Sequence, residues 1–279
     1  MSAPFQRVGI VGVGLIGGSV ALATRRAHPA THLVGLDTGR ELDLAHVVDR
    51  RARSLGELAD ADLILVSVPV ADLARTLGAL AEAAPAALVT DVCSTKRTAM
   101  AEARKAGLKA FIGGHPMAGS ERAGLESARP DLFDKRPWLL VRGSAGLDHE
   151  ERLKTFVASL GAAPHWLEAD EHDRTVAYVS HLPQMLAAAL MNTGEAGVPA
   201  TGPIAAGRAF REMTRLASSP SAMWTSVLAD NADFVREALE AFLRQLPDAA
   251  SAPGDWVREA LASSGQARER WCASDPPTE

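Results

Sequence analysis

Short apolar segments alternate with longer amphipathic ones through the first half of the chain. The apolar segments are rich in β-branched residues and show no polar alternation, which is typical of strands buried on both faces of a parallel sheet. The segments between them carry apolar residues at helical spacing. We therefore predict an α/β fold with a Rossmann-type parallel sheet. Its strands are expected at residues 7–11, 32–36, 62–69, 87–92, 109–112, 136–141 and 164–167.

Strand-like segments give way to helical ones in the second half of the chain. Few β-branched runs follow the last predicted strand, and apolar residues recur there at intervals of three and four. We therefore expect two domains, a dinucleotide-binding domain over residues 1–168 and an all-helical domain over residues 169–279. The helices of the second domain are expected at about residues 170–193, 203–217 and 253–266, and from residue 220 onward.

Two of these helices have features that bear on structure and assembly. Pro183 lies inside the first of them and should bend or interrupt it, because proline removes one backbone hydrogen bond. The helix that begins at Pro220 has an apolar face too wide for a helix that packs on one domain. We therefore expect that face to pack against a second chain, in a homodimer.

Composition and charge limit the possible partners and locations. The net charge of −5 gives no sign of a protein that binds nucleic acid or a membrane surface. No apolar run reaches the length of a membrane span, and the N-terminus lacks the features of a secretory signal. The two cysteines, Cys93 and Cys272, have neither metal-site spacing nor the density of a disulfide scaffold. We expect a cytoplasmic protein without a metal.

The clearest motif is a glycine fingerprint, G-x-G-x-x-G, between the first predicted strand and the helix after it. Its first glycine makes the turn, its second lets the backbone approach a pyrophosphate, and its third allows helix and strand to pack closely. The free N–H groups of the helix start would bind the anion. A packing turn in an unrelated α/β domain is the alternative. The predicted cofactor site comprises Gly12, Gly14, Leu15, Ile16, Gly17, Asp37, Val68 and Pro69.

The acidic residue of this site also bears on the choice of cofactor. Asp37 ends the second predicted strand, twenty residues after Gly17, where a carboxylate would accept hydrogen bonds from the adenosine ribose. A 2′-phosphate would meet a like charge there, so NAD is favoured over NADP. Arg40 could partly neutralise that repulsion, which keeps NADP as the less favoured alternative.

The segment Gly113–Gly124 is the strongest candidate for chemistry. It places His115 between glycines and Pro116, at the expected exit of a strand, and histidine can take a proton near neutral pH. Ser94 and Lys96 follow another strand end, where ligands bind in open α/β sheets. A helix cap and a solvated surface lysine are the alternative roles of those two residues.

The helical half adds further candidates. His181 lies just before the break at Pro183, although a lone helical histidine is more often a core or surface residue. Arg208, Arg211 and Arg215 would lie on one face of the helix expected at residues 203–217. Such a basic stripe is either a solvated face or a clamp for a carboxylate, which a guanidinium binds with two parallel hydrogen bonds.

Five blocks of the sequence together resemble the prephenate/arogenate dehydrogenase family of tyrosine biosynthesis, also called cyclohexadienyl dehydrogenases. The resemblance covers about residues 7–245. It is most specific in GGHPMAGSE and SHLP, and less so in the glycine fingerprint. The blocks are GVGLIGGS (12–19), DVCSTK (91–96), the segment 113–124, EHDRTVAYVSHLP (171–183) and FREMTRLA (210–217).

The resemblance implies a nucleotide-binding domain followed by a helical dimerisation domain. It implies NAD-dependent oxidative decarboxylation of prephenate to 4-hydroxyphenylpyruvate, or of arogenate to tyrosine. Lys96, Arg211 and His172 are secondary candidates. By resemblance, His115 matches the catalytic histidine that hydrogen-bonds the ring hydroxyl of the substrate, and Ser94 matches the serine that helps orient that histidine and the ligands. His181 matches the substrate-binding histidine, and Arg215 matches the arginine that receives a substrate carboxylate.

One departure from the family pattern concerns the substrate. Relatives that prefer prephenate often have S-H-L-P-H, whereas Gln184 follows Pro183 here. We therefore add Gln184 to the expected substrate site and keep an arogenate-specific enzyme as an alternative. A hydroxyacid dehydrogenase with a lysine base in its helical half is disfavoured, because no lysine follows Lys154. A non-catalytic dinucleotide sensor would bind NAD without any need for His115.

Overall fold

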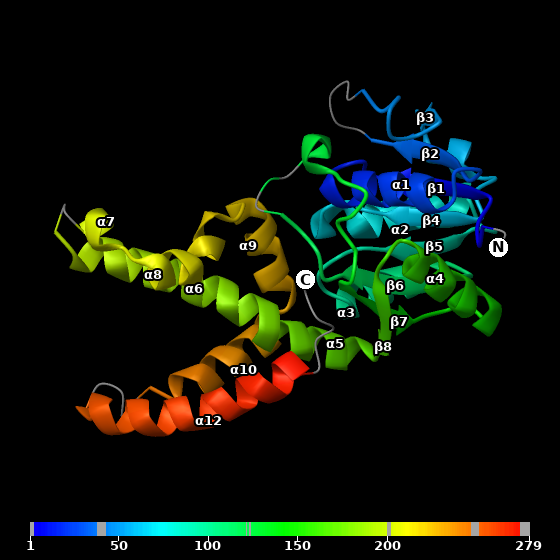
Figure 1. Ribbon diagram of the computed structural model, residues 1–279. Helices are drawn as coiled ribbons and strands as arrows, with labels where there is room; N and C mark the ends of the chain where they lie inside the picture. The colour runs from blue at the N-terminus through cyan, green and yellow to red at the C-terminus, as the bar shows by residue number, and fades with distance from the viewer. Residues whose placement is uncertain are drawn as a thin grey trace.

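The computed structural model describes residues 3–37, 43–120, 122, 124–199, 202–246 and 251–273. Within them the strands form one eight-stranded sheet in the order β3-β2-β1-β4-β5-β6-β7-β8 (Figure 1). The α/β prediction is confirmed. The strands are β1 (Arg7–Val11), β2 (His32–Leu36), β3 (Arg50–Ala52), β4 (Leu63–Val66), β5 (Leu88–Asp91), β6 (Phe111–Pro116), β7 (Pro137–Arg142) and β8 (Ala163–Leu167).

Helices cover both faces of the sheet, as buried parallel strands require. Neighbouring residues of one strand belong to different hydrophobic clusters, as Ile10 and Val11 of β1 do. One cluster lies under α1 and α4, and the other under α2 and α3. The helices of this half are α1 (Leu15–Ala27), α2 (Val70–Ala83), α3 (Arg97–Ala106) and α4 (Leu147–Ser159).

The sheet differs from the prediction at both of its edges. β3, at one edge, was not predicted, because its sequence Arg50-Arg51-Ala52 has no apolar run. At the other edge β7 pairs antiparallel with β6 and parallel with β8, so these two strands run against the rest. A parallel neighbour needs a crossover, usually a helix, but the described part of the β6–β7 connection holds only the short turn Leu125–Ser127.

The strand that carries His115 is longer than predicted. β6 runs through Pro116 instead of ending at residue 112, and His115 pairs with Leu139 of β7. The glycines of this strand do not form a turn; they allow the neighbouring strand to pack closely against β6. A Cβ at Gly114 would lie 2.5 Å from the backbone oxygen of Asp91. His115 is therefore held by sheet hydrogen bonds on the rigid part of the fold.

We expect Gly114→Ala to destabilise the protein by about 3 kcal/mol or more, because the added methyl group meets strand backbone that cannot move aside. Thermal unfolding followed by circular dichroism measures this effect. Gly78→Ala in α2 is the matched control, because a Cβ there meets no atom within 4 Å. Equal melting temperatures for the wild type and Gly114→Ala would contradict this description of β6.

The helical half is more broken than its sequence pattern suggested. The first segment is interrupted near Pro183, as predicted: a π-helical turn (Ala177–His181) joins α5 to α6. The prediction of a single helix at residues 203–217 is wrong, because two short helices and a 3₁₀ turn (Arg215–Ser218) form there. The helix after Pro220 divides at Asn231. The helices are α5 (Ala169–Val176), α6 (Leu182–Gly197), α7 (Gly202–Ala205), α8 (Arg208–Met213), α9 (Ser221–Asp230), α10 (Ala232–Leu243) and α12 (Pro253–Ala273).

These helices extend away from the sheet half in two arms (Figure 1). α6 forms one arm with α8, whose Phe210 packs against Gly194. α10 and α12 form the other arm, where the Trp256 indole donates to the Gln245 carbonyl at 2.8 Å. Large apolar side chains remain exposed on both arms, such as Ile204 (88%) and Trp271 (69%). Among the described residues, no helix has the length and apolar character needed to cross a membrane.

Candidate active site

The glycine fingerprint forms a loop that fits a dinucleotide. Gly12 has a φ of +89°, and a side chain there would overlap the Ser67 carbonyl. Gly14 precedes α1 without a side-chain cap, and a Cβ there would meet no atom within 4 Å. The start of α1 thus has no side-chain cap and has space beside Gly14, which fits pyrophosphate binding at its first N–H groups.

The other predicted cofactor residues surround this loop. The backbone N–H of Val13 donates to the Asp37 carboxylate at 2.8 Å, which holds this acid at the end of β2. Leu15 and Ile16 line a cavity of about 410 Å³. Val68 and Pro69 lie between β4 and α2, directly after the Ser67 carbonyl that Gly12 approaches. Arg40, which could modulate the preference for NAD, lies outside the described residues.

We expect Asp37→Ser to lower the preference for NAD over NADP by about 10-fold or more, because it removes the like charge that a 2′-phosphate would meet. The ratio of kcat/KM for the two cofactors measures this change. Asp148→Ser, on the surface of α4, is the matched control and should leave the ratio unchanged. An unaltered ratio in Asp37→Ser would show that Asp37 does not determine the preference.

One cavity of about 410 Å³ lies between the sheet half and the helical half. His115, Ser94, Gln184 and Arg215 all line it, beside Leu15 and Ile16 of the cofactor loop. The structure thus brings together predicted residues from both halves. The remaining lining residues are Val92, Pro116, Met117, Ala118, Gly119, Ser120, Ser180, Leu216, Ser219, Pro220, Met223 and Trp224.

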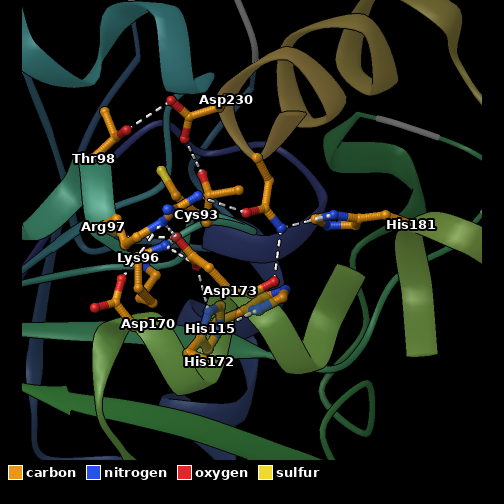
Figure 2. A network of polar contacts seen from close by, with 12 residues as sticks. Cys93, Lys96, Arg97, Thr98, His115, Asp170, His172, Asp173, His181 and Asp230 are labelled. Carbon is orange, nitrogen blue, oxygen red and sulfur yellow. Dashed lines mark hydrogen bonds and ion pairs between the residues drawn. The ribbon is translucent and has the colours of Figure 1, made fainter. Parts of the chain in front are cut away.

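His115 is buried at the wall of this cavity, and its ring is held from behind. Its Nδ1 lies 2.9 Å from Nε2 of His172, and Nδ1 of His172 lies 2.8 Å from the Asp173 carboxylate (Figure 2). Burial lowers the pKa of His115 well below its ordinary value of 6.5, and the nearby His172 and Lys96 lower it further. His115 is therefore neutral at pH 7 and able to accept a proton.

Ser94 lines the same cavity as His115, and the orienting role that the resemblance implies for it stays a prediction. Within the described chain, however, the hydrogen-bond partner of the His115 ring is His172, not Ser94. His172, only a secondary candidate from the sequence, therefore holds the His115 ring by a hydrogen bond.

Lys96 does not line the cavity. It is fully buried, forms an ion pair with Asp91, and donates to the Gly114 carbonyl at 2.6 Å. Asp91 also accepts the Gly114 N–H at 3.1 Å. This pair therefore fixes the backbone next to His115. Asp91 was missed, although it begins the DVCSTK block at the end of a predicted strand.

Of the predicted arginine stripe, only Arg215 lines the cavity. Arg208 pairs with Glu212, and Arg211 donates to the Ala206 carbonyl. The 3₁₀ turn that begins at Arg215 is tied to α6 by Gln184. The Gln184 amide donates to the Leu216 carbonyl at 2.7 Å and accepts from the Ser219 hydroxyl at 3.2 Å.

His181 lies behind the cavity wall and does not line the cavity. Its ring edge packs on Trp224, with ring centroids 5.9 Å apart, and Trp224 lines the cavity. Its Nδ1 lies 3.2 Å from the side-chain amide of Asn231. Burial lowers the pKa of His181 to about 4, so the ring is neutral. Its predicted contact with substrate stays a prediction.

A polar joint connects the two halves beside this site, at the start of α3 (Figure 2). The Asp173 carboxylate accepts the backbone N–H groups of Lys96 and Arg97 at 2.6 and 2.9 Å. The Arg97 guanidinium pairs with Asp233 and lies 4.4 Å above the ring of Phe234. These long-range contacts give no local signal in the sequence. A second part of the joint comprises hydrogen bonds from Thr95 and Thr98 to Asp230.

Both halves of this chain match known proteins. The family model described as the nucleotide-binding domain of prephenate dehydrogenase matches residues 20–163, and the one described as its dimerization domain matches residues 168–261. The prephenate dehydrogenase of Lactococcus lactis is 33% identical over 88% of this chain and 70% of its own. The cyclohexadienyl dehydrogenase of Zymomonas mobilis is 30% identical over 95% of both chains.

Two solved structures are similar over almost the whole chain. A prephenate dehydrogenase from A. aeolicus, in complex with hydroxyphenyl propionate and NAD+, is 27% identical with a TM-score of 0.84, over 95% of this chain and 98% of its own. The Synechocystis arogenate dehydrogenase is 26% identical with a TM-score of 0.81, over 95% of this chain and 99% of its own. Both matches span the sheet half and the helical half together.

Proposed function

We propose that this chain, which belongs to the prephenate dehydrogenase family, catalyses the NAD-dependent oxidative decarboxylation of prephenate to 4-hydroxyphenylpyruvate, or of arogenate to tyrosine. The observation that carries the proposal is the convergence of three groups on one cavity. These are a neutral histidine, an arginine and the dinucleotide loop. They meet the three needs of the reaction, a proton acceptor, a carboxylate anchor and a place for the cofactor.

The glycine loop and Asp37 hold the cofactor in this proposal. The open space at Gly14 and the free N–H groups of α1 fit its pyrophosphate, and the Asp37 carboxylate fits its ribose. NAD is the cofactor, and when bound it supplies the acceptor for a hydride from C4 of the substrate ring. Leu15 and Ile16 face the same cavity as His115, so the cofactor loop adjoins the proposed base.

His115 acts as the general base on the ring hydroxyl. Its neutral ring accepts the hydroxyl proton as the C4 hydride leaves, and a carbonyl forms at C4. The bond between the ring and its carboxylate then breaks and carbon dioxide departs. The electron pair of that bond passes through the ring to the C4 oxygen, which takes a proton back from His115 as the ring becomes aromatic. Arg215 binds a substrate carboxylate and orients the ring toward His115. Ser94 faces the same cavity, and Gln184 holds the turn that carries Arg215.

We expect kcat/KM to stay constant as the pH falls from about 8 through 6.5, and to decline only at lower pH. The base must be neutral to accept a proton, and its pKa is lowered from 6.5, so activity is lost only as the pH falls through that lowered value. A pH–rate profile measures this, with circular dichroism at each pH as the control for acid unfolding. A decline centred at or above pH 6.5 would contradict it.

The choice between prephenate and arogenate is tested by assaying the purified protein with both substrates in parallel. Turnover of either substrate supports the proposed reaction, and the ratio of the two kcat/KM values assigns the preferred one. Turnover of arogenate alone would identify an arogenate-specific enzyme. NAD+ binding without turnover of either would instead support a dinucleotide sensor.

We also propose that the protein is a homodimer with a domain boundary between residues 168 and 169. β8 ends at Leu167 and α5 begins at Ala169. The exposed apolar side chains of the two arms support a second chain packed on the helical half, for which the matched model is a dimerization domain. A solution mass of two chains is the expected result, and a monomer would contradict it.

A further inference from the structure

We infer that His172 and Asp173, from the helical half, fix the tautomer of His115 and thereby leave its Nε2 free to act as the base. The inference rests on the proposed function, because it assigns positioning residues to the same reaction. It stands on a chain of three buried groups, Asp173, His172 and His115, whose facing atoms lie 2.8 and 2.9 Å apart.

The direction of these hydrogen bonds follows from the chemistry of the end group. An ionised carboxylate can only accept hydrogen bonds, so Nδ1 of His172 must carry the proton directed at Asp173. A neutral His172 then has a bare Nε2, which can only accept. Nδ1 of His115 is therefore the donor to His172, and Nε2 of the neutral His115 ring carries no proton.

The contacts around Asp173 keep it ionised. Although burial opposes ionisation, hydrogen bonds from His172 and from the N–H groups of Arg97 and Lys96 lower the pKa of the Asp173 carboxyl group. The Arg97 Nε–H lies 3.2 Å from the same carboxylate. Asp173 is thus fixed as the hydrogen-bond acceptor at one end of the series Asp173, His172 and His115.

His172 itself is kept neutral, as its acceptor role requires. Its side chain is fully buried, and burial lowers its pKa from 6.5. The Asp173 carboxylate alone would raise that pKa, but the lowering prevails. A neutral His172 ring between the Asp173 carboxylate and the His115 ring can orient His115 without itself taking part in the reaction.

The three groups come from different parts of the fold. His115 lies on β6 of the sheet, whereas His172 and Asp173 lie on α5, and Asp173 binds the start of α3 (Figure 2). The tautomer of His115 thus depends on the docking of α5 against the sheet half. If the two halves separated, His115 would lose its acceptor and either ring nitrogen could carry the proton.

The test is the tautomer of His115 in the free protein, read by NMR of ¹⁵N-labelled histidines and assigned with His115→Asn. We expect the wild-type His115 ring to be protonated at Nδ1 and bare at Nε2. In His172→Phe, which keeps a ring but has no acceptor, we expect protonated Nε2 to appear. An Nε2-protonated ring in the wild type, or an unchanged tautomer in His172→Phe, would overturn the inference.

Kinetics add a second readout that a merely structural role would not produce. We expect His172→Phe to lower kcat roughly 10- to 100-fold, with the KM for NAD+ within about twofold of wild type. His172→Gln restores a side-chain acceptor and should recover both the tautomer and most of kcat. A glutamine variant as slow as the phenylalanine variant would count against the inference.

Two features of the design separate the possible failures. His165→Phe, an exposed histidine of β8, is the matched control and should change neither readout. The NMR experiment needs no turnover. If the wild type oxidised neither substrate while His172→Phe altered the His115 tautomer, the proposed function would fail and the assignment of His172 would stand. If His172→Phe did not fold, an Nε2-protonated His115 ring in the wild type, or a different tautomer in His172→Gln, would still overturn the inference.

Discussion

His115→Asn lowers kcat by about 10²–10⁴-fold, the usual contribution of a positioned general base. Asparagine offers no group that takes a proton near neutral pH. Its side-chain amide can still donate toward His172, which preserves the buried contact now made by Nδ1 of His115. The loss is therefore expected in turnover and not in folding or cofactor binding.

Three measurements test this expectation together. Steady-state kinetics give kcat, isothermal titration gives the Kd for NAD+, and thermal unfolding reports stability. His165→Asn, on the exposed surface of β8, is the matched control and should behave as the wild type. A His115→Asn variant that keeps turnover within a few-fold of the wild type would show that His115 is not the base.

Arg215→Gln raises the activation free energy that corresponds to kcat/KM by about 2–5 kcal/mol, because a bound carboxylate would lose its charged partner inside the cavity. That range corresponds to roughly 30- to 4,000-fold. The substitution keeps a polar side chain, which is shorter and carries no charge. We expect the Kd for NAD+ to stay near the wild-type value, because Arg215 belongs to the helical half and not to the glycine loop that is proposed to hold the cofactor.

Arg208→Gln provides a matched control for the loss of one arginine. Arg208 lies in the same part of the chain, but it is exposed, pairs with Glu212 and does not line the cavity. Equal losses of kcat/KM in the two variants would point to net charge or stability as the cause. That result would remove Arg215 from the substrate site.

The sheet was predictable because its signals are local. Continuous apolar runs identified β1, β2, β4 and β5, and the glycine fingerprint identified the cofactor loop directly. β3 was missed because an edge strand with two arginines has no such run. The same limit applied to β6, whose glycines were interpreted as a loop. Only the neighbouring strand shows that they allow close packing.

The candidate site was predictable where a residue belongs to a block that resembles the family. His115, Ser94 and Arg215 were identified in this way, whereas Gln184 was identified as a departure from the family pattern. All four residues line one cavity. The same blocks imply that His181 contacts the substrate. In the structure its ring packs on Trp224, which lines the cavity, and the contact with substrate stays a prediction. A sequence block indicates which residues gather at a site, but it does not say which side chain faces the ligand.

The contacts of the residues that support the site could not be predicted in this way. Asp173 binds the backbone N–H of Lys96, which lies 77 positions earlier in the chain. Asn231 interrupts an apolar helix face and then proves to be fully buried, with its amide donating to the Asp173 carbonyl. Their partners are set by tertiary packing, for which a single sequence has no local pattern.

In the proposed reaction, one cavity carries out both the oxidation and the decarboxylation of the substrate. The most direct measurement is the simultaneous release of reduced nicotinamide and carbon dioxide by the purified protein with NAD+ and prephenate, and in parallel with arogenate. We predict equal amounts of the two products with at least one substrate. Binding of NAD+ with neither product from either substrate would contradict the account.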